Sequence, residues 1–176
     1  MGRRIVEQQL ETTQLATFFV GDLFFGINVM QVQEIIRYQE MTPVPLSSSI
    51  VEGLINLRGQ IITAIDLRKR LGLPKAVSER KPMNVVVGVN EEVVSLLVDQ
   101  IGDVVEVSQS QYEEAPDTLE PFLGSVVSGV FKLDGSLLLM LNVEAAVREG
   151  SFDAHETITP AHFQGALEGL ANEPLR

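Results

Sequence analysis

Residues 53–68 read G-L-I-N-L-R-G-Q-I-I-T-A-I-D-L-R, and the same outline returns 76 residues further on, where residues 129–144 read G-V-F-K-L-D-G-S-L-L-L-M-L-N-V-E. The two stretches share two glycines, the leucine between them and the apolar block that follows. Agreement at several positions is the signature of an internal repeat. We therefore expect two copies of one small unit.

The repeat extends upstream at a slightly different offset. Residues 26–36, G-I-N-V-M-Q-V-Q-E-I-I, align with residues 95–105, S-L-L-V-D-Q-I-G-D-V-V, at an offset of 69. The connection to the next matched segment is sixteen residues long in the first copy (37–52) and twenty-three in the second (106–128). One insertion in the second copy therefore explains both offsets.

Short blocks of Val, Ile, Leu and Phe separated by turn signals predict an all-β fold. Each pair of blocks flanks a two-residue turn: Gly21-Asp22, Arg58-Gly59, Asn90-Glu91 and Asp134-Gly135. Such turns are typical of tight β-hairpins, and glycine suits their positive φ angles. The expected strands cover residues 15–20, 23–29, 55–57, 60–66, 83–89, 92–98, 130–133 and 136–142.

The segments between the hairpins are less regular. Residues 29–36 fit either a helical turn that points Val32, Ile35 and Ile36 inward or a strand, because Q-V-Q-E-I also alternates. Two prolines and a serine run predict a loop at residues 42–49.

A short helix is expected at residues 67–71. Asp66 is a favourable N-cap residue, and Gly72 followed by Pro74 is a typical helix end.

The chain divides into three regions by composition. Residues 14–150 form the predicted globular domain, and the polar residues 1–13 are expected to be a flexible N-terminus. Residues 151–176 carry a net charge of −3 and lack the β-branched blocks, which indicates an acidic appendage. Thr159 and Pro160 could begin a helix there.

The charge is distributed unevenly. The chain has a net charge of −11, yet its first 90 residues carry ten Lys or Arg and eight Asp or Glu, whereas the remainder carries three and sixteen. Nine carboxylates and no basic residue fall between Glu91 and Glu120. Such a surface repels phosphate backbones, so we expect no nucleic-acid partner. The acidic stretch is either a solvated face or a protein-docking surface.

Location follows from what the sequence lacks. No apolar run approaches the roughly 18 residues of a membrane span, and no secretory signal opens the chain. We therefore expect a cytoplasmic protein without direct membrane insertion.

The sequence offers little for catalysis. There is no cysteine, both histidines follow residue 150, and no glycine-rich phosphate loop occurs. The acidic pairs at Glu91 and Glu113 and the Asp134 turn are better explained as solvated turns. We predict no enzymatic activity, no catalytic residue, no cofactor and no metal site.

Arg58 is the residue that folding explains least. It occupies an expected hairpin tip, where the second copy has Asp134. An exposed arginine there is either a solvated turn charge or an anchor for a partner's carboxylates or carbonyls.

Three motifs together resemble the CheW family of bacterial chemotaxis coupling proteins: V-Q-E-I at Val32–Ile35, the stretch at residues 53–68, and residues 129–143 ending in L-N-V. The resemblance covers residues 14–147. It implies two SH3-like five-stranded β-barrel subdomains related by a pseudo-twofold duplication, with short connecting helices. The implied function is a non-enzymatic adaptor that couples methyl-accepting chemoreceptors to the chemotaxis histidine kinase in membrane-associated signalling arrays.

An alternative stays open. The same module also occurs in related components, such as a receiver-linked adaptor or the regulatory domain of the kinase itself.

The resemblance also implies a groove between the barrels that binds the helical tip of the chemoreceptor. Its residues in this chain are Val32, Glu34, Gly53, Asn56 and Arg58. Val32 would supply apolar contact, Arg58 a polar anchor, and Gly53 room for close backbone approach. Glu34 would either pair with a basic residue of the partner or hold Arg58 in place. For the kinase, hairpin tips and barrel edges are the expected contact.

Overall fold

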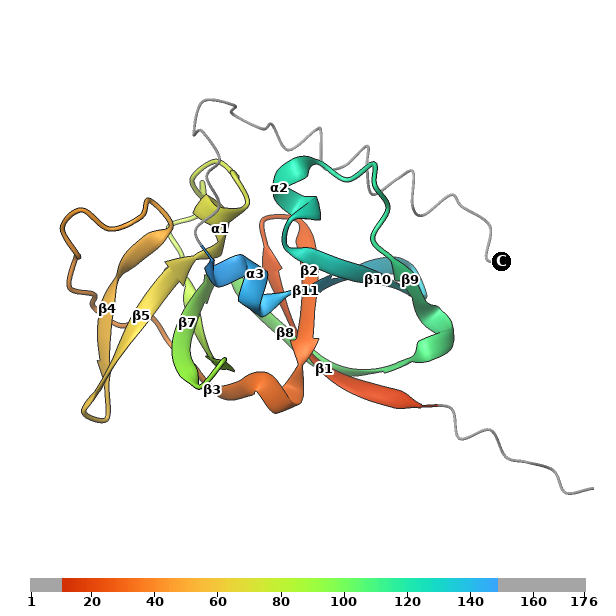
Figure 1. The fold of residues 1–176 in the computed structure, drawn as a ribbon, viewed down its shortest axis with the longest axis horizontal. Coiled ribbons are helices and arrows are strands. Elements are labelled where there is room, and N and C mark those ends of the chain that lie inside the picture. Colours follow the sequence, from red (N-terminus) through yellow and green to blue (C-terminus); the bar gives the residue numbers. More distant parts are fainter. Residues whose placement is uncertain (1–10, 149–176) are drawn as a thin grey trace, which may run out of the picture.

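The structure is a computed structural model, and it describes residues 11–148. The appendage expected at residues 151–176, its helix, and most of the expected flexible N-terminus lie outside these residues. Strands dominate the described part, and they form two sheets with a few short helices (Figure 1). The prediction of an all-β fold with two subdomains is confirmed.

The first sheet has six strands in the order β8-β1-β2-β11-β10-β9. Their bounds are β1 Thr12–Val20, β2 Leu23–Asn28, β8 Gln100–Ser108, β9 Tyr112–Glu114, β10 Val127–Leu133 and β11 Ser136–Leu141. The second sheet has five strands in the order β3-β6-β7-β5-β4. Their bounds are β3 Val32–Ile36, β4 Val51–Leu57, β5 Gln60–Asp66, β6 Met83–Val89 and β7 Glu92–Val98. Only the second sheet has the five strands expected for each subdomain, because β9, within the insertion of the second copy, adds a sixth strand to the first.

All four expected hairpins form. β1 pairs with β2, β4 with β5, β6 with β7, and β10 with β11, each antiparallel across its two-residue turn. At the offset of 76, β4 corresponds to β10, β5 to β11, and the short helix α1 (Leu67–Arg70) to α3 (Val143–Val147). The internal repeat is therefore a repeat of structure.

The two copies do not coincide with the two sheets. Strands β1 and β2 of the first copy join the six-stranded sheet, whereas β6 and β7 of the second copy join the five-stranded one. Two parallel pairings, β2 with β11 and β5 with β7, join the exchanged strands to the other strands of their sheets. Each subdomain is thus built from both halves of the chain.

The subdomains also share a core. Phe18 and Phe25 stack with ring centroids 5.8 Å apart in the six-stranded sheet, and they belong to the same buried cluster as Leu67 and Leu96 from the other side. Burying one continuous apolar surface fixes the two sheets against each other.

Residues 29–36 contain both a helical turn and a strand, the two conformations that their sequence allowed. A 3₁₀ turn at Val29–Gln31 leads into β3, with the Asn28 side chain accepting a hydrogen bond from the Met30 N–H. Only the helical alternative pointed Ile35 inward; in the strand that forms, Ile35 is 41% exposed. A register shift between Val32 and Glu34 turns Glu34 and Ile36 to the face opposite that of Val32 and Ile35.

The expected helix at residues 67–71 is confirmed as α1. The Asp66 carboxylate accepts a hydrogen bond from the Lys69 N–H at 3.2 Å, and Gly72 ends the helix with a φ of +65°. The expected loop at residues 42–49 is also present, apart from one bridge between Thr42 and Leu54.

Strand β8 was not predicted. It lies at the edge of its sheet, and among its residues only Val107 is fully buried, so it lacks the apolar alternation that marks a half-buried strand. The acidic stretch between Glu91 and Glu120 therefore contains an exposed edge strand.

Candidate functional site

The motif V-Q-E-I forms β3, one of the two edges of the five-stranded sheet. Val32 lies opposite Val87 of β6 and is half-buried against the main core. A register shift follows Val32, so Glu34 lies opposite Val86 and faces the other side of the sheet, where it is also half-buried. The bulge therefore directs the two predicted residues to opposite faces of β3.

The motif N-L-R-G forms the tip of the β4–β5 hairpin. Arg58 and Gly59 have φ angles of +52° and +85°, the left-handed pair that a tight hairpin requires. The Asn56 Oδ1 accepts a hydrogen bond from the Gly59 N–H at 3.0 Å. Asn56 therefore stabilises the turn that carries Arg58. A left-handed conformation costs a residue with a side chain roughly 1–2 kcal/mol, so an arginine is an unfavourable choice at this position for folding.

An ion pair joins the two motifs. Arg58 donates a hydrogen bond from Nη2 to the Glu34 Oε1 at 2.7 Å. The Arg58 side chain is 78% exposed and that of Glu34 is 26% exposed. Because β3 and β4 are opposite edges of the same sheet, the pair spans the open seam between them. Of the two roles expected for Glu34, the structure shows the one that holds Arg58.

This ion pair adds little to stability. Exposed pairs contribute roughly 0.2–1 kcal/mol, because solvent screens the charges and two long side chains lose freedom. The pair instead sets the direction of the guanidinium group, most of which remains accessible.

Gly53 has a different environment. A Cβ added there would lie 2.7 Å from the backbone oxygen of Thr42. The backbones of Thr42 and Leu54 are joined by two hydrogen bonds of 2.9 Å, one donated by each residue's N–H. The close approach at Gly53 is therefore made by a crossing segment of the same chain. The corresponding Gly129 has the same constraint, since an added Cβ would collide with the ring of Tyr112.

The structure thus joins Glu34 to Arg58 and uses Asn56 to support the turn that carries Arg58, whereas Val32 packs toward the main core on the other face of β3 and Gly53 lies under Thr42. An exposed apolar residue also lies beside the tip: Ile61 is opposite Asn56 on β5 and is 60% exposed. Sequence patterning did not single out Ile61, because it belongs to an apolar block that is otherwise core.

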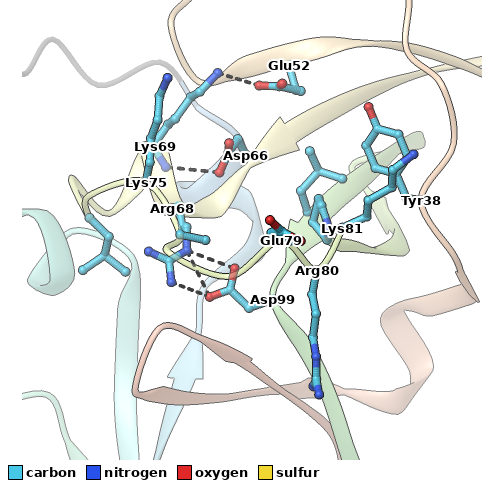
Figure 2. Close-up of a pocket in the computed structure, with 14 residues that line it drawn as sticks. Tyr38, Glu52, Asp66, Arg68, Lys69, Lys75, Glu79, Arg80, Lys81 and Asp99 are labelled. Atoms are coloured by element: carbon cyan, nitrogen blue, oxygen red, sulfur yellow. Dashed lines mark hydrogen bonds and ion pairs between the residues drawn. The ribbon is translucent and has the colours of Figure 1, made fainter.

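The last motif residue, Arg68, forms a contact that the sequence did not predict. Its Nε and Nη2 donate to both oxygens of Asp99 at 2.8–3.0 Å (Figure 2). The same carboxylate accepts a 2.5 Å hydrogen bond from the Gly21 N–H. Forked arginine–carboxylate pairs are strong and directional. Asp99 therefore ties α1 to the tip of the β1–β2 hairpin, and so links the two subdomains.

The carboxyl group of Asp66, at the start of α1, has a pKa that differs from its ordinary value. Burial raises the pKa of its carboxyl above the ordinary value, and the hydrogen bond and charge of Lys69 only partly oppose this. Its role is that of a helix cap.

The described residues do not bring together three metal-ligating side chains of the His, Cys, Asp or Glu type. None of the helices between residues 11 and 148 has the length and hydrophobicity of a membrane span.

The sequence and the fold match known proteins. Residues 14–151 match the family of CheW-like domains. The chain is 33% identical to chemotaxis protein CheW of Rhizobium meliloti over 132 residues, which is 75% of this chain and 85% of that protein. It is 32% identical to chemotaxis protein CheW of Treponema pallidum over 137 residues, 76% and 81% of the two chains. With chemotaxis protein CheW of Bacillus subtilis the identity is 30% over 138 residues, 78% and 88%.

A solved structure shares the fold. The crystal structure of the scaffolding protein TtCheW from Thermoanaerobacter tengcongensis superposes with a TM-score of 0.73 at 23% identity, covering 81% of this chain and 97% of that one. The repeat, the interleaved sheets and the sequence matches agree, and the chain belongs to the CheW-like domain family.

Proposed function

We propose that this chain is a non-enzymatic adaptor that couples methyl-accepting chemoreceptors to the chemotaxis histidine kinase. Its family membership makes it a chemotaxis adaptor. The coupling of these two partners, at cytoplasmic arrays beneath the membrane, is the specific part of the proposal. Residues 14–150 would carry this function.

The Glu34–Arg58 pair is the observation that supports the receptor contact. Arg58 sits in a backbone conformation that disfavours it, in an ion pair that adds little stability, and with most of its guanidinium exposed. Unfavourable local choices of this kind cluster at binding sites. An arginine whose direction is fixed by Glu34 is a suitable anchor for carbonyls or carboxylates on a partner.

The surroundings of Arg58 suit a helical partner. Val32 offers partly exposed apolar surface on β3, and Ile61 offers more beside the tip. An amphipathic helix needs apolar contact beside a few polar anchors, and Ile61 and Arg58 offer both at the hairpin tip. We include Gly53 among the proposed receptor residues only as a support of β4, because its own chain fills the space above it.

Reconstituted kinase activation tests the proposal. A receptor signalling fragment and the kinase are mixed with and without this chain, and kinase autophosphorylation is measured. We expect the kinase to respond to the receptor only when the chain is present. An equal response without the chain would contradict the coupling role.

The alternative, a module acting within a related component, predicts a different result. A regulatory domain taken from a kinase would inhibit coupling by competing with the resident domain, rather than restore it.

A further inference from the structure

A second surface lies at the end of β5 remote from Arg58. Strand β5 begins at the hairpin tip and ends at Asp66, next to α1 (Figure 1). There the loop of residues 72–82 borders two neighbouring cavities of about 510 and 430 Å³. Both are lined by Arg80, Lys81 and Asp99. We refer to the two cavities together as the basic groove.

The groove extends across the boundary between the subdomains. Its larger part contacts Tyr38 after β3 and Leu97 in β7, on the five-stranded sheet. Its smaller part reaches Gln100 and Ile101 of β8, on the six-stranded sheet. Two adjacent cavities that share a wall form an elongated site, which suits an extended chain better than a compact molecule.

Positive charge is concentrated around this groove. Residues 67–82 contain six Lys or Arg and one acidic residue, in a chain whose net charge is −11. Six of the chain's thirteen basic residues therefore lie in this short segment. A local field of opposite sign to the rest of the protein attracts anionic groups selectively.

Most of the acidic residues that line the groove are already occupied. The Asp99 carboxylate accepts hydrogen bonds from the Gly21 N–H and from Arg68. The Glu52 carboxylate pairs with Lys69 at 2.5 Å, and Figure 2 shows this pair beside the Arg68–Asp99 pair. Asp66 caps α1. Of the acidic lining residues, Glu79 is left to oppose the cations.

Three cations remain available. Within residues 11–148 neither Lys75 nor Arg80 forms an ion pair, and the Lys81 ammonium lies 4.9 Å from the centre of the Tyr38 ring. Figure 2 shows Lys81 beside Tyr38 and Arg80 directed away from the Arg68–Asp99 pair. The ring restricts the lysine without neutralising it, so its charge remains available to an anion.

The groove also has apolar surface. Leu73, Pro82 and Leu97 contribute to its lining, and Val77 at the outer side of the loop is fully exposed. Apolar contact beside several unpaired cations fits a peptide that carries both carboxylates and aliphatic side chains.

We propose that the basic groove binds an acidic, extended peptide segment of a partner protein. Arg80 and Lys75 pair with its carboxylates, and its aliphatic side chains pack on Leu73 and Leu97. The proposal does not depend on the receptor contact, because the groove and Arg58 lie at opposite ends of β5.

The test measures binding of a fluorescein-labelled peptide rich in Glu and Leu to the full chain by fluorescence anisotropy. A peptide with Lys in place of Glu is the charge control. Arg80→Glu alters the groove, and Arg37→Glu is the matched control, because Arg37 is an exposed arginine outside the groove and the change in net charge is the same.

We expect the acidic peptide to bind, the lysine peptide not to bind, and Arg80→Glu to raise Kd by about tenfold or more while Arg37→Glu changes it less than about threefold. Equal weakening by the two substitutions would overturn the proposal, because it would show a response to net charge alone. Absence of binding by the unaltered chain at low salt would also overturn it.

A third variant distinguishes the source of the acidic segment. Residues 149–156 of this chain contain Glu149, Asp153 and Glu156. If the combined substitution of these three residues by Gln, Asn and Gln leaves Kd unchanged, the groove is free for an external partner. A several-fold tighter Kd would overturn the proposed external occupant and assign the groove to this chain's own segment. Arg80→Glu should leave kinase coupling intact in the reconstituted assay, so failure of either proposal is recognisable separately.

Discussion

The β4–β5 and β10–β11 hairpins occupy equivalent places in the two copies, and they agree wherever the fold constrains them. Both have a register shift next to the glycine, at Gly53 and Gly129, and at each glycine a crossing segment leaves no room for a Cβ. Both lead into a short helix whose first turn is capped by a side chain, Asp66 in one and Asn142 in the other.

The two hairpins differ at their tips. Arg58 is left-handed and pairs with Glu34, whereas in the second copy Asp134 takes the place of Arg58 and Asp103 that of Glu34, and only Gly135 of that turn has a positive φ. Two acidic residues cannot form the equivalent ion pair. Features kept in both copies serve the fold, and those that diverge are candidates for function.

The largest expected effect is on receptor binding, when the residue at the first hairpin tip is changed to the residue of the second. Arg58→Asp gives the first tip the charge of the second and places an acid beside Glu34. We expect receptor-fragment binding to weaken by at least about 2 kcal/mol, roughly thirtyfold in Kd, as for an interface anchor. Titration of the fragment measures this.

The unfolding free energy should change by less than about 1 kcal/mol, because the lost pair is exposed. Asp134→Arg is the matched control and should leave receptor binding unchanged. Loss of kinase binding by Arg58→Asp would place Arg58 on a different surface.

Substituting the glycines that the two hairpins share tests the features that serve the fold in both copies. We expect Gly53→Ala and Gly129→Ala each to lower the unfolding free energy by about 1–3 kcal/mol, as is usual for overpacking. Urea unfolding measures both. Gly88→Ala is a control with a smaller expected loss, since the added Cβ would meet only the flexible end of Gln33, at 3.3 Å. An unchanged Gly53→Ala protein that loses receptor binding would make Gly53 a contact residue instead.

Arg58→Asn separates folding from binding at the same position. Asparagine tolerates the left-handed conformation better than arginine, so stability should stay constant or rise by up to about 1 kcal/mol. Receptor binding should fall nonetheless, because the guanidinium is gone. The melting temperature measures the change in stability, and titration of the receptor fragment measures the loss of binding. A clear loss of stability would mean that the Glu34–Arg58 pair supports the fold.

The smallest expected effect concerns the helix caps. Asp66→Asn makes the first copy like the second, and both residues cap equally well. Burial raises the pKa of Asp66, so its ionisation costs the folded state as pH rises through that pKa. The substituted protein should therefore gain stability relative to the original at neutral pH, by less than the roughly 1 kcal/mol of a lost cap.

That gain should vanish as pH falls toward 3.8 and below, where the unfolded carboxyl is also protonated. Urea midpoints across this range measure the trend. A gain that grows on acidification would contradict the sign of the shift.

The sequence by itself determined the elements with local physical causes. Turn residues predicted four hairpins, Asp66 and Gly72 predicted the limits of α1, and the repeat predicted two related units. These signals act within a few residues, through φ preferences, capping hydrogen bonds and strand alternation. The resemblance to a known family identified the candidate residues of the receptor site.

Only the tertiary structure decided how these parts combine. The exchange of strands between the sheets, the polar edge strand β8, the Arg68–Asp99 link and the contact of Glu34 with Arg58 join residues far apart in the chain. Such contacts depend on which surfaces are buried together, and no local pattern records that. The same reason explains Gly53: the family resemblance implied room there for the close approach of a partner, and packing shows the space already filled by Thr42.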